Sequence, residues 1–231
     1  MAGFDLIIFD CDGVLVDSEI ICSRVESELL TEAGYPISAE EHSERFAGMT
    51  WRNTLLTVEK EADIPFSASL IDKVEKILDA RLPKEIEAIE GVQAVLEKLT
   101  LPFCVCSNST SHRLDMMLSA VKLKPLFKGH IYSARDLGED RVKPKPDIFL
   151  HGAKQMGAKP ARALVVEDSV HGVEAARAAG MRVVGFTGGS HTYPSHADRL
   201  TDAGAETVIS RMSMLPGVIA ALAEWSEDAV A

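Results

Sequence analysis

Residues 6–19 read LIIFDCDGVLVDSE, and this stretch indicates the kind of sheet that the chain forms. Its first four residues are apolar, and two carboxylates, Asp10 and Asp12, follow them, with Gly13 next. A short apolar run that ends in polar residues is typical of a strand buried in a parallel sheet. A solvated turn could also carry two acids. Acidic side chains at the end of a buried strand, however, are unusual enough to indicate a functional position.

Four further apolar runs have the same character: FCVC at 103–106, HIY at 130–132, ALVV at 163–166 and RVVGF at 182–186. Amphipathic helical patterns lie between them. Strands that alternate with helices form βαβ units with right-handed crossovers. The sequence therefore predicts an α/β fold whose core is a doubly wound, Rossmann-like and mainly parallel sheet.

One region interrupts this alternation. Between about residues 16 and 83 the chain shows amphipathic helical segments and no convincing strand pattern. We therefore expect two parts, an α/β core formed by residues 1–15 and 84–231 and a helical cap formed by residues 16–83. Substrate would lie between the core and the cap.

The composition excludes several classes of protein. The chain has 35 acidic and 24 basic residues and a formal net charge of −11, so it lacks the basic surface of a nucleic-acid-binding protein. No apolar run approaches the roughly 20 residues of a membrane-spanning helix. The first residues, MAGFD, lack the basic start of a secretory signal. We therefore expect a cytoplasmic protein without nucleic-acid or membrane partners, present as a monomer or a weak homodimer.

The cysteines indicate neither a metal site nor a disulfide framework. The spacing of the four matches no zinc or CxxC pattern, and two of them lie in strand-like runs. Buried, reduced thiols are the simplest interpretation for an intracellular protein.

Polar residues follow the ends of the predicted strands or precede the next helix: Asp10, Asp12, Ser107, Asn108, Lys143, Glu167 and Asp168. In an open α/β sheet, ligands bind outside the carboxyl ends of the strands. We therefore expect these side chains to meet in one crevice. Four acids there would repel one another unless a cation lay among them, and oxygen ligands without His or Cys favour Mg²⁺. The cofactor that we expect is therefore Mg²⁺.

This set of groups indicates phosphoryl transfer on a small phosphorylated metabolite. Ser107, Asn108 and Lys143 offer donors for phosphate oxygens. Asp10 could attack phosphorus to form an aspartyl-phosphate, while Mg²⁺ and Lys143 screen the repulsion between the two anions. Asp12 is placed to protonate the leaving oxygen and later to activate water. The residues other than Asp10 and Asp12 could also have simpler roles. The polar residues before helices could be N-caps, and Lys143 could be a surface residue before a proline turn.

Four stretches together resemble the four motifs of the haloacid dehalogenase superfamily: FDCDGVLVDSE, CSNS, KPKPDIF and VVEDSVHGVEAARAAGM. The resemblance covers nearly the whole chain, including a helical cap inserted after the first motif. It implies that Asp10 is the nucleophile and that Asp12 is the general acid/base, with a backbone carbonyl that also ligates Mg²⁺. The remaining motif positions fall on Ser107, on Lys143, and on Glu167 and Asp168, with Asp168 preferred as the direct metal ligand.

Departures from the motifs reduce the number of activities within the superfamily that this chain could have. Dehalogenases and phosphonoacetaldehyde hydrolases lack the second aspartate of the first motif, so Asp12 argues against both. β-Phosphoglucomutases share this type of cap, but they carry a His where this chain has Cys22 and an Arg where it has Trp51. The resemblance therefore implies a phosphatase for a small sugar phosphate or sugar-acid phosphate, with 6-phosphogluconate as a candidate. The alternatives are a phosphoglucomutase-like mutase and a non-catalytic relative that binds a phospho-ligand.

Four residues of the cap are candidates for substrate specificity: Arg24, Arg45, Trp51 and Arg52. Each arginine could face the crevice and bind a carboxylate or hydroxyl group of the substrate, or form a salt bridge on a solvated face instead. Trp51 could pack inside the cap or form a wall of the substrate site. The histidines of HTYPSH at 191–196 are expected to lie in a mobile loop.

Overall fold

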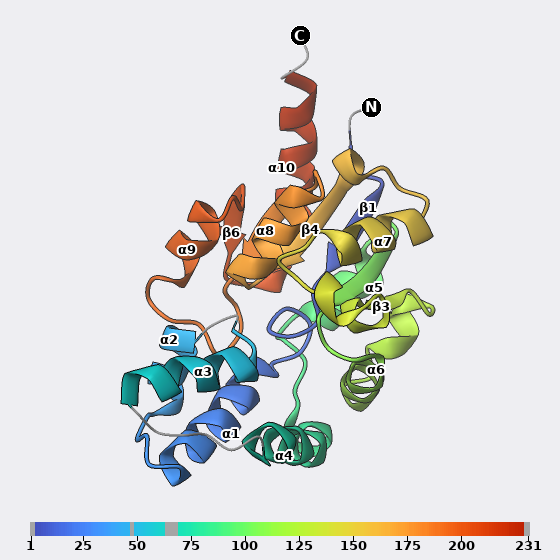
Figure 1. Ribbon diagram of the computed structural model, residues 1–231. Coiled ribbons are helices and arrows are strands. Elements are labelled where there is room, and N and C mark those ends of the chain that lie inside the picture. Colours follow the sequence, from blue (N-terminus) through green and yellow to red (C-terminus); the bar gives the residue numbers. More distant parts are fainter. Residues whose placement is uncertain (1–2, 47–48, 63–68, 229–231) are drawn as a thin grey trace.

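A sheet of six parallel strands forms the centre of the computed structural model, which describes residues 3–46, 49–62 and 69–228. The strands lie in the order β3-β2-β1-β4-β5-β6 (Figure 1). Their bounds are Leu6–Phe9 (β1), Phe103–Ser107 (β2), Ile131–Ser133 (β3), Ala163–Glu167 (β4), Arg182–Phe186 (β5) and Thr207–Ile209 (β6). The predicted α/β fold is confirmed. Of the six strands, only β6 was not predicted.

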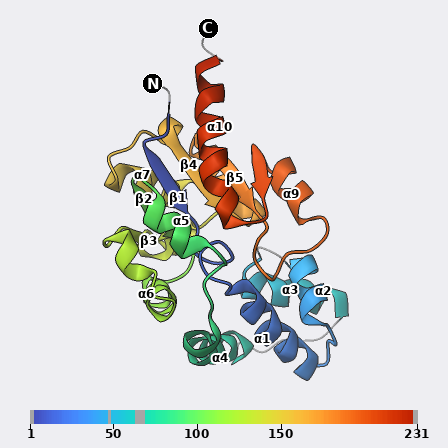
Figure 2. The same ribbon diagram turned by 180° about the vertical axis from the view of Figure 1, so that it is seen from behind.

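Helices cover both faces of the sheet (Figures 1 and 2). Leu6 and Ile8 of β1 point to the face covered by α7 (Asp147–Gln155), α8 (Val170–Ala178) and α9 (His196–Asp202). Ile7 and Phe9 alternate to the opposite face, which is covered by α5 (Val92–Lys98), α6 (Ser111–Ala120) and α10 (Leu215–Asp228). Because both faces are covered, a continuous apolar run such as LIIF is buried on both sides.

Short 3₁₀ turns complete the connections, at Lys124–Phe127, Ala134–Asp136, Glu139–Arg141, Pro160–Arg162 and Met212–Met214.

Four helices between β1 and α5 lie together beyond one end of the sheet, and we call them the helical insert (Figures 1 and 2). They are α1 (Glu19–Glu32), α2 (Ala39–Phe46), α3 (Trp51–Ala62) and α4 (Ser69–Glu85). Helix α1 packs against both α2 and α4. The chain passes between sheet and insert twice, and the two passages pair at Val16 and Ala88.

The expected boundary between residues 83 and 84 falls inside the last turn of α4, because this helix continues through Pro83 to Glu85. A proline removes one hydrogen bond of a helix without necessarily ending it. We keep the division into a core and a cap as a proposal. Its second boundary is better placed after Glu85, where α4 ends.

The register of the sheet brings the strand ends together. Phe9 is paired with Val105 on one side and with Val166 on the other. The residues that follow these positions in β1, β2 and β4 consequently share one edge, which faces the helical insert.

None of the helices in the described ranges is long and apolar enough to cross a membrane. All four cysteines are free thiols; Cys11, Cys104 and Cys106 are buried and Cys22 is partly exposed.

Candidate active site

A cavity of about 480 Å³ lies between the carboxyl ends of the strands and the helical insert. Its lining includes six of the strand-end and loop residues that the sequence singles out: Asp10, Asp12, Ser107, Asn108, Lys143 and Asp168. Glu167 is completely buried beneath them and contacts Lys143. The structure thus brings together every residue predicted from the ends of the strands.

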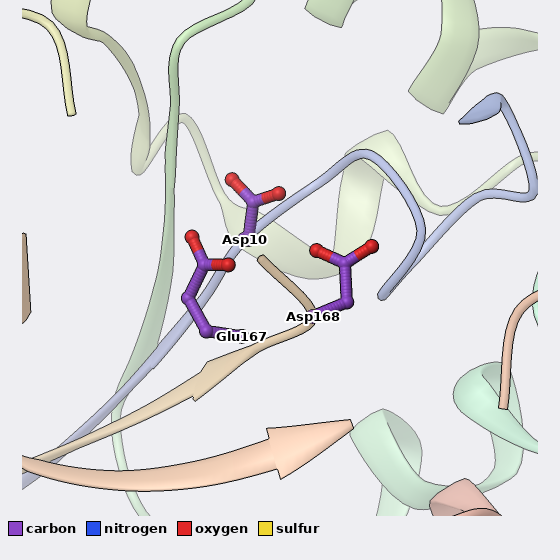
Figure 3. Close-up of side chains that lie close together, drawn as sticks. All are labelled: Asp10, Glu167 and Asp168. Carbon is purple, nitrogen blue, oxygen red and sulfur yellow. The ribbon is translucent and has the colours of Figure 1, made fainter. Parts of the chain in front are cut away.

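Three carboxylates gather at the base of this cavity, those of Asp10, Glu167 and Asp168 (Figure 3). Each offers an oxygen, and these oxygens lie within 4.8 Å of one another. Burial raises the pKa of Asp10 and of Asp168 well above the usual range, and Glu167 nearby raises both further. Carboxylates this close cannot all ionise easily without a cation. The hard oxygen donors of the cluster fit Mg²⁺.

Gly13 allows the chain to turn tightly against Asp168. Its φ angle is +71°, and a Cβ atom built on it would lie 1.8 Å from Oδ2 of Asp168. Only glycine adopts this conformation at little cost and leaves this space free. The glycine of the first motif is therefore required by the position of the fourth motif.

Lys143 is the buried cation of the site. Its Nζ donates hydrogen bonds of 2.5 Å to Oδ1 of Asp10 and to Oε1 of Glu167. Burial alone would lower the pKa of Lys143, but the two carboxylates outweigh it and raise the pKa overall. The backbone N–H of Lys143 donates to Oδ1 of Asn108 at 2.9 Å, so Asn108 also helps to position the lysine.

Asp12 lies outside the carboxylate cluster and is held by hydroxyl groups. Its Oδ1 accepts a hydrogen bond of 2.7 Å from Ser18, and its Oδ2 accepts bonds of 3.1 Å from Ser107 and 2.8 Å from Ser109. The roles of Ser18 and Ser109 were not predicted, although both lie within the motifs DSE and CSNS. The serine network fixes the Asp12 carboxylate beside Asp10 while leaving it on the cavity wall.

The segment HTYPSH is a loop that leads into α9, and its two histidines are buried against Asp168 while Thr192, Pro194 and Ser195 are exposed. Nε2 of His191 lies 3.0 Å from Oδ2 of Asp168, and Nε2 of His196 is 2.6 Å from the backbone oxygen of the same residue. The rings of His191 and His196 also pack edge to face. Both histidines are thus supports of the acidic cluster.

The specificity candidates of the cap are placed differently from one another. Trp51 is buried, lines the cavity and donates from Nε1 to the oxygen of Leu70 at 3.1 Å. Arg24, Arg45 and Arg52 are exposed and are not among the described residues that line the cavity. Arg45 instead pairs with Glu41 and Glu61 on the surface of the insert.

Two arginines do line the cavity, Arg113 and Arg135, and sequence reasoning missed both. Arg113 belongs to α6 and reaches α4, where its Nη2 lies 2.5 Å from Glu75 and 3.0 Å from Asp79. Further polar residues of α1 and α2 also line this end of the cavity: Glu19, Ser23, Glu26, His42 and Ser43. No local motif marks them, since their position depends on how the helices pack.

The parallel sheet and the acidic cavity at its edge are those of a phosphatase. Residues 7–186 match the haloacid dehalogenase-like hydrolase family, and the chain belongs to that family. It is 32% identical over 217 residues to 6-phosphogluconate phosphatase of Escherichia coli strain K12. The matched residues cover 94% of this chain and 95% of that protein. The resemblance to the haloacid dehalogenase superfamily, and to a sugar-acid phosphate phosphatase within it, is confirmed. The protein is accordingly a phosphoric monoester hydrolase.

Two solved structures are similar over almost the whole chain. A haloacid dehalogenase-like protein of unknown function from Agrobacterium tumefaciens is 74% identical, with a TM-score of 0.93, and covers 96% of this chain and 100% of that one. A hydrolase of the same family from Deinococcus radiodurans, with bound phosphate and sodium, is 35% identical with a TM-score of 0.81, covering 97% of each chain.

Proposed function

We propose that the protein is a Mg²⁺-dependent phosphatase that hydrolyses a small sugar phosphate or sugar-acid phosphate through an aspartyl-phosphate on Asp10. The observation that carries this proposal is the position of Asp10. Its carboxylate lies in the cavity beside Lys143 and within 4.8 Å of Glu167 and Asp168. A nucleophile among acids needs compensating positive charge, and the site offers a buried lysine and a set of oxygen ligands for a cation.

The reaction would use the residues as follows. An oxygen of Asp10 attacks phosphorus, and the bond from phosphorus to the sugar oxygen breaks. Asp12 gives a proton to the leaving oxygen and then takes one from the water that hydrolyses the aspartyl-phosphate. Ser107, Asn108 and Lys143 would bind the phosphate oxygens, and Lys143 would also offset the negative charge of Asp10 and Glu167.

Asp10 and Asp168 would hold the Mg²⁺ ion together with the backbone carbonyl of Asp12, and when bound the ion would neutralise charge on the phosphate. Glu167 is a less favourable direct ligand of the metal than Asp168, because Glu167 already contacts Nζ of Lys143 and accepts two hydrogen bonds from Ser169.

6-Phosphogluconate is the first substrate to test, because the Escherichia coli relative is named for it. The phosphate bound to the Deinococcus radiodurans relative also supports a phosphate site. A phosphoglucomutase-like reaction is the alternative, and formation of glucose 6-phosphate from β-glucose 1-phosphate would favour it. We further propose that the enzyme works in the cytoplasm, on free metabolites, as a monomer or weak homodimer.

The test is the rate of phosphate release with Mg²⁺ and with the metal removed by EDTA. Asp10→Asn should lower kcat by about a thousandfold or more, as the loss of a nucleophile does in other enzymes. Asp5→Asn is the matched control, since Asp5 precedes β1 and pairs with Arg162 on the surface. Substantial release by Asp10→Asn, or equal rates with and without metal, would contradict the proposal.

A further inference from the structure

His42 is a buried polar side chain with unused hydrogen-bonding capacity at the insert end of the cavity. Only 3% of the residue is exposed, yet it lines the cavity. Within the described residues, neither ring nitrogen has a hydrogen-bond partner. Buried polar groups are normally paired. Nε2 of His42 has a carboxylate beside it, but Nδ1 has no partner, which leaves a hydrogen bond for a ligand to supply.

Glu26 lies beside this imidazole. Its Oε2 is 3.1 Å from Nε2 of His42, at ion-pair distance but without the alignment of a hydrogen bond. The Glu26 side chain is mostly buried, 16% exposed, and also lines the cavity. The two groups therefore face the same space from neighbouring helices, α1 and α2.

The backbone around the pair is fixed by packing. Oγ of Ser43 donates a buried hydrogen bond of 2.8 Å to Oγ of Ser23, which joins α2 to α1. The ring of Phe46 packs 5.2 Å from that of His42, centre to centre. Glu26 lies three residues after Ser23 and His42 one residue before Ser43, so the serine bond holds the pair in place. These are the properties of a preformed polar subsite.

The charges at this end of the cavity disfavour an anion. The carboxylates of Glu26 and Glu75 line it, and the nearby guanidinium of Arg113 is already paired with Glu75 and Asp79. A substrate carboxylate placed here would face Glu26 without a cation of its own, and like charges in contact cost affinity. A hydroxyl group could donate to Glu26 and complete the hydrogen bonds of His42.

We propose that Glu26 and His42 form the subsite that binds hydroxyl groups of the sugar, and that the preferred substrate is uncharged at the end remote from its phosphate. This inference rests on the proposed phosphatase function and selects a polyol or aldose phosphate over a sugar-acid phosphate. It assigns specificity to two residues of the insert in place of its exposed arginines.

The test compares two substrates that differ at one carbon. Glucitol 6-phosphate ends in CH₂OH where 6-phosphogluconate ends in a carboxylate. For the wild-type enzyme with Mg²⁺, kcat/KM should be at least about tenfold higher for glucitol 6-phosphate. Glu26→Gln keeps the shape but removes the charge, so the ratio of the two values should fall about tenfold. Because both substrates are measured on one sample, partial misfolding cancels in the ratio.

Glu28→Gln is the matched control, because Glu28 lies on α1 but is 61% exposed and pairs with Arg81; it should leave the ratio unchanged. His42→Leu is the second variant. It should raise KM for glucitol 6-phosphate more than KM for p-nitrophenyl phosphate, which has no sugar hydroxyls.

The outcomes separate the two proposals. Suppose that the wild type hydrolyses p-nitrophenyl phosphate. If it then shows no preference for glucitol 6-phosphate, or if Glu26→Gln leaves the ratio unchanged, the subsite is overturned and the phosphatase function stands. No phosphate release from any of the three compounds overturns the phosphatase function and the subsite with it.

Discussion

Glu19 illustrates how the cavity changes a single side chain. It opens α1 and lines the cavity. Burial raises its pKa from 4.5 to about 8; the charge of His191 opposes this rise, while Asp12, Asp168 and Glu26 add to it. At neutral pH the folded protein therefore holds a proton on Glu19 that the unfolded chain has released.

This proton makes stability depend on pH. Between pH 4.5 and about 8 the folded state binds one proton more than the unfolded state at this residue, so the free energy of unfolding should fall as pH rises through that window. The slope for one proton is at most about 1.4 kcal/mol per pH unit, and solvent around this partly exposed side chain reduces it. Glu19→Gln should remove the contribution, so that its stability relative to the wild type increases from pH 5 to pH 8.

Urea unfolding in EDTA at several pH values measures the effect, with Glu32→Gln at the exposed end of α1 as the control. Parallel pH profiles for the wild type and Glu19→Gln would contradict a raised pKa.

The residues that could be predicted from sequence differ physically from those that could not. Asp10 and Asp168 follow apolar runs, and parallel strands bring such positions to one edge in any α/β sheet. No such rule predicts the positions of Glu26, His42 and Arg113. Each is a polar residue on a helix, and only the packing of one helix against the next decides whether it faces solvent or the cavity. The surface position of the predicted arginines has the same cause.

At the scale of the element, α8 shows how a helix start supports the site. Oγ of Ser169 accepts a hydrogen bond of 3.1 Å from the backbone N–H of Gly172, which caps the helix. Oε2 of Glu167 accepts bonds of 2.9 and 3.0 Å from the N–H and hydroxyl of Ser169. Glu167 is thus oriented by the first turn of the helix that follows it, and the residue that caps this helix is Ser169.

Gly172 leaves room for that acid, and we expect Gly172→Ala to be destabilising. Helix propensity alone would favour Ala by about 1 kcal/mol. A Cβ atom at this position, however, would lie 1.8 Å from Oε1 of Glu167. Because Glu167 would have to leave Lys143, we expect a loss of about 2–4 kcal/mol of stability and most of the activity.

Gly217→Ala in α10 is the matched control, since nothing lies within 4 Å of a Cβ atom there. This change should raise stability by up to about 1 kcal/mol. Thermal unfolding of the two variants should therefore shift in opposite directions, and a shift in the same direction would count against the close contact.

At the scale of the whole molecule, few polar contacts join the helical insert to the sheet. Arg113 of α6 binds Glu75 and Asp79 of α4, and its side chain is 16% exposed. On the other side, the N–H of Ser190 donates to Oδ1 of Asp17 at 3.0 Å, and its hydroxyl contacts Oδ2. The first contact thus joins α6 to the middle of α4, and the second joins the loop before α9 to the passage that leads into α1.

Arg113→Met should therefore let the insert move away from the sheet. The variant keeps the length of the side chain but loses both ion pairs, and Glu75 and Asp79 are exposed enough to remain solvated. We expect a larger radius of gyration by small-angle X-ray scattering and a fall of about tenfold in kcat/KM. Arg81→Met is the control, because Arg81 of α4 pairs with Glu28 and Glu85 inside the insert. Scattering profiles that stay identical in Arg113→Met would show that the Arg113 ion pairs are not needed to hold the two parts together.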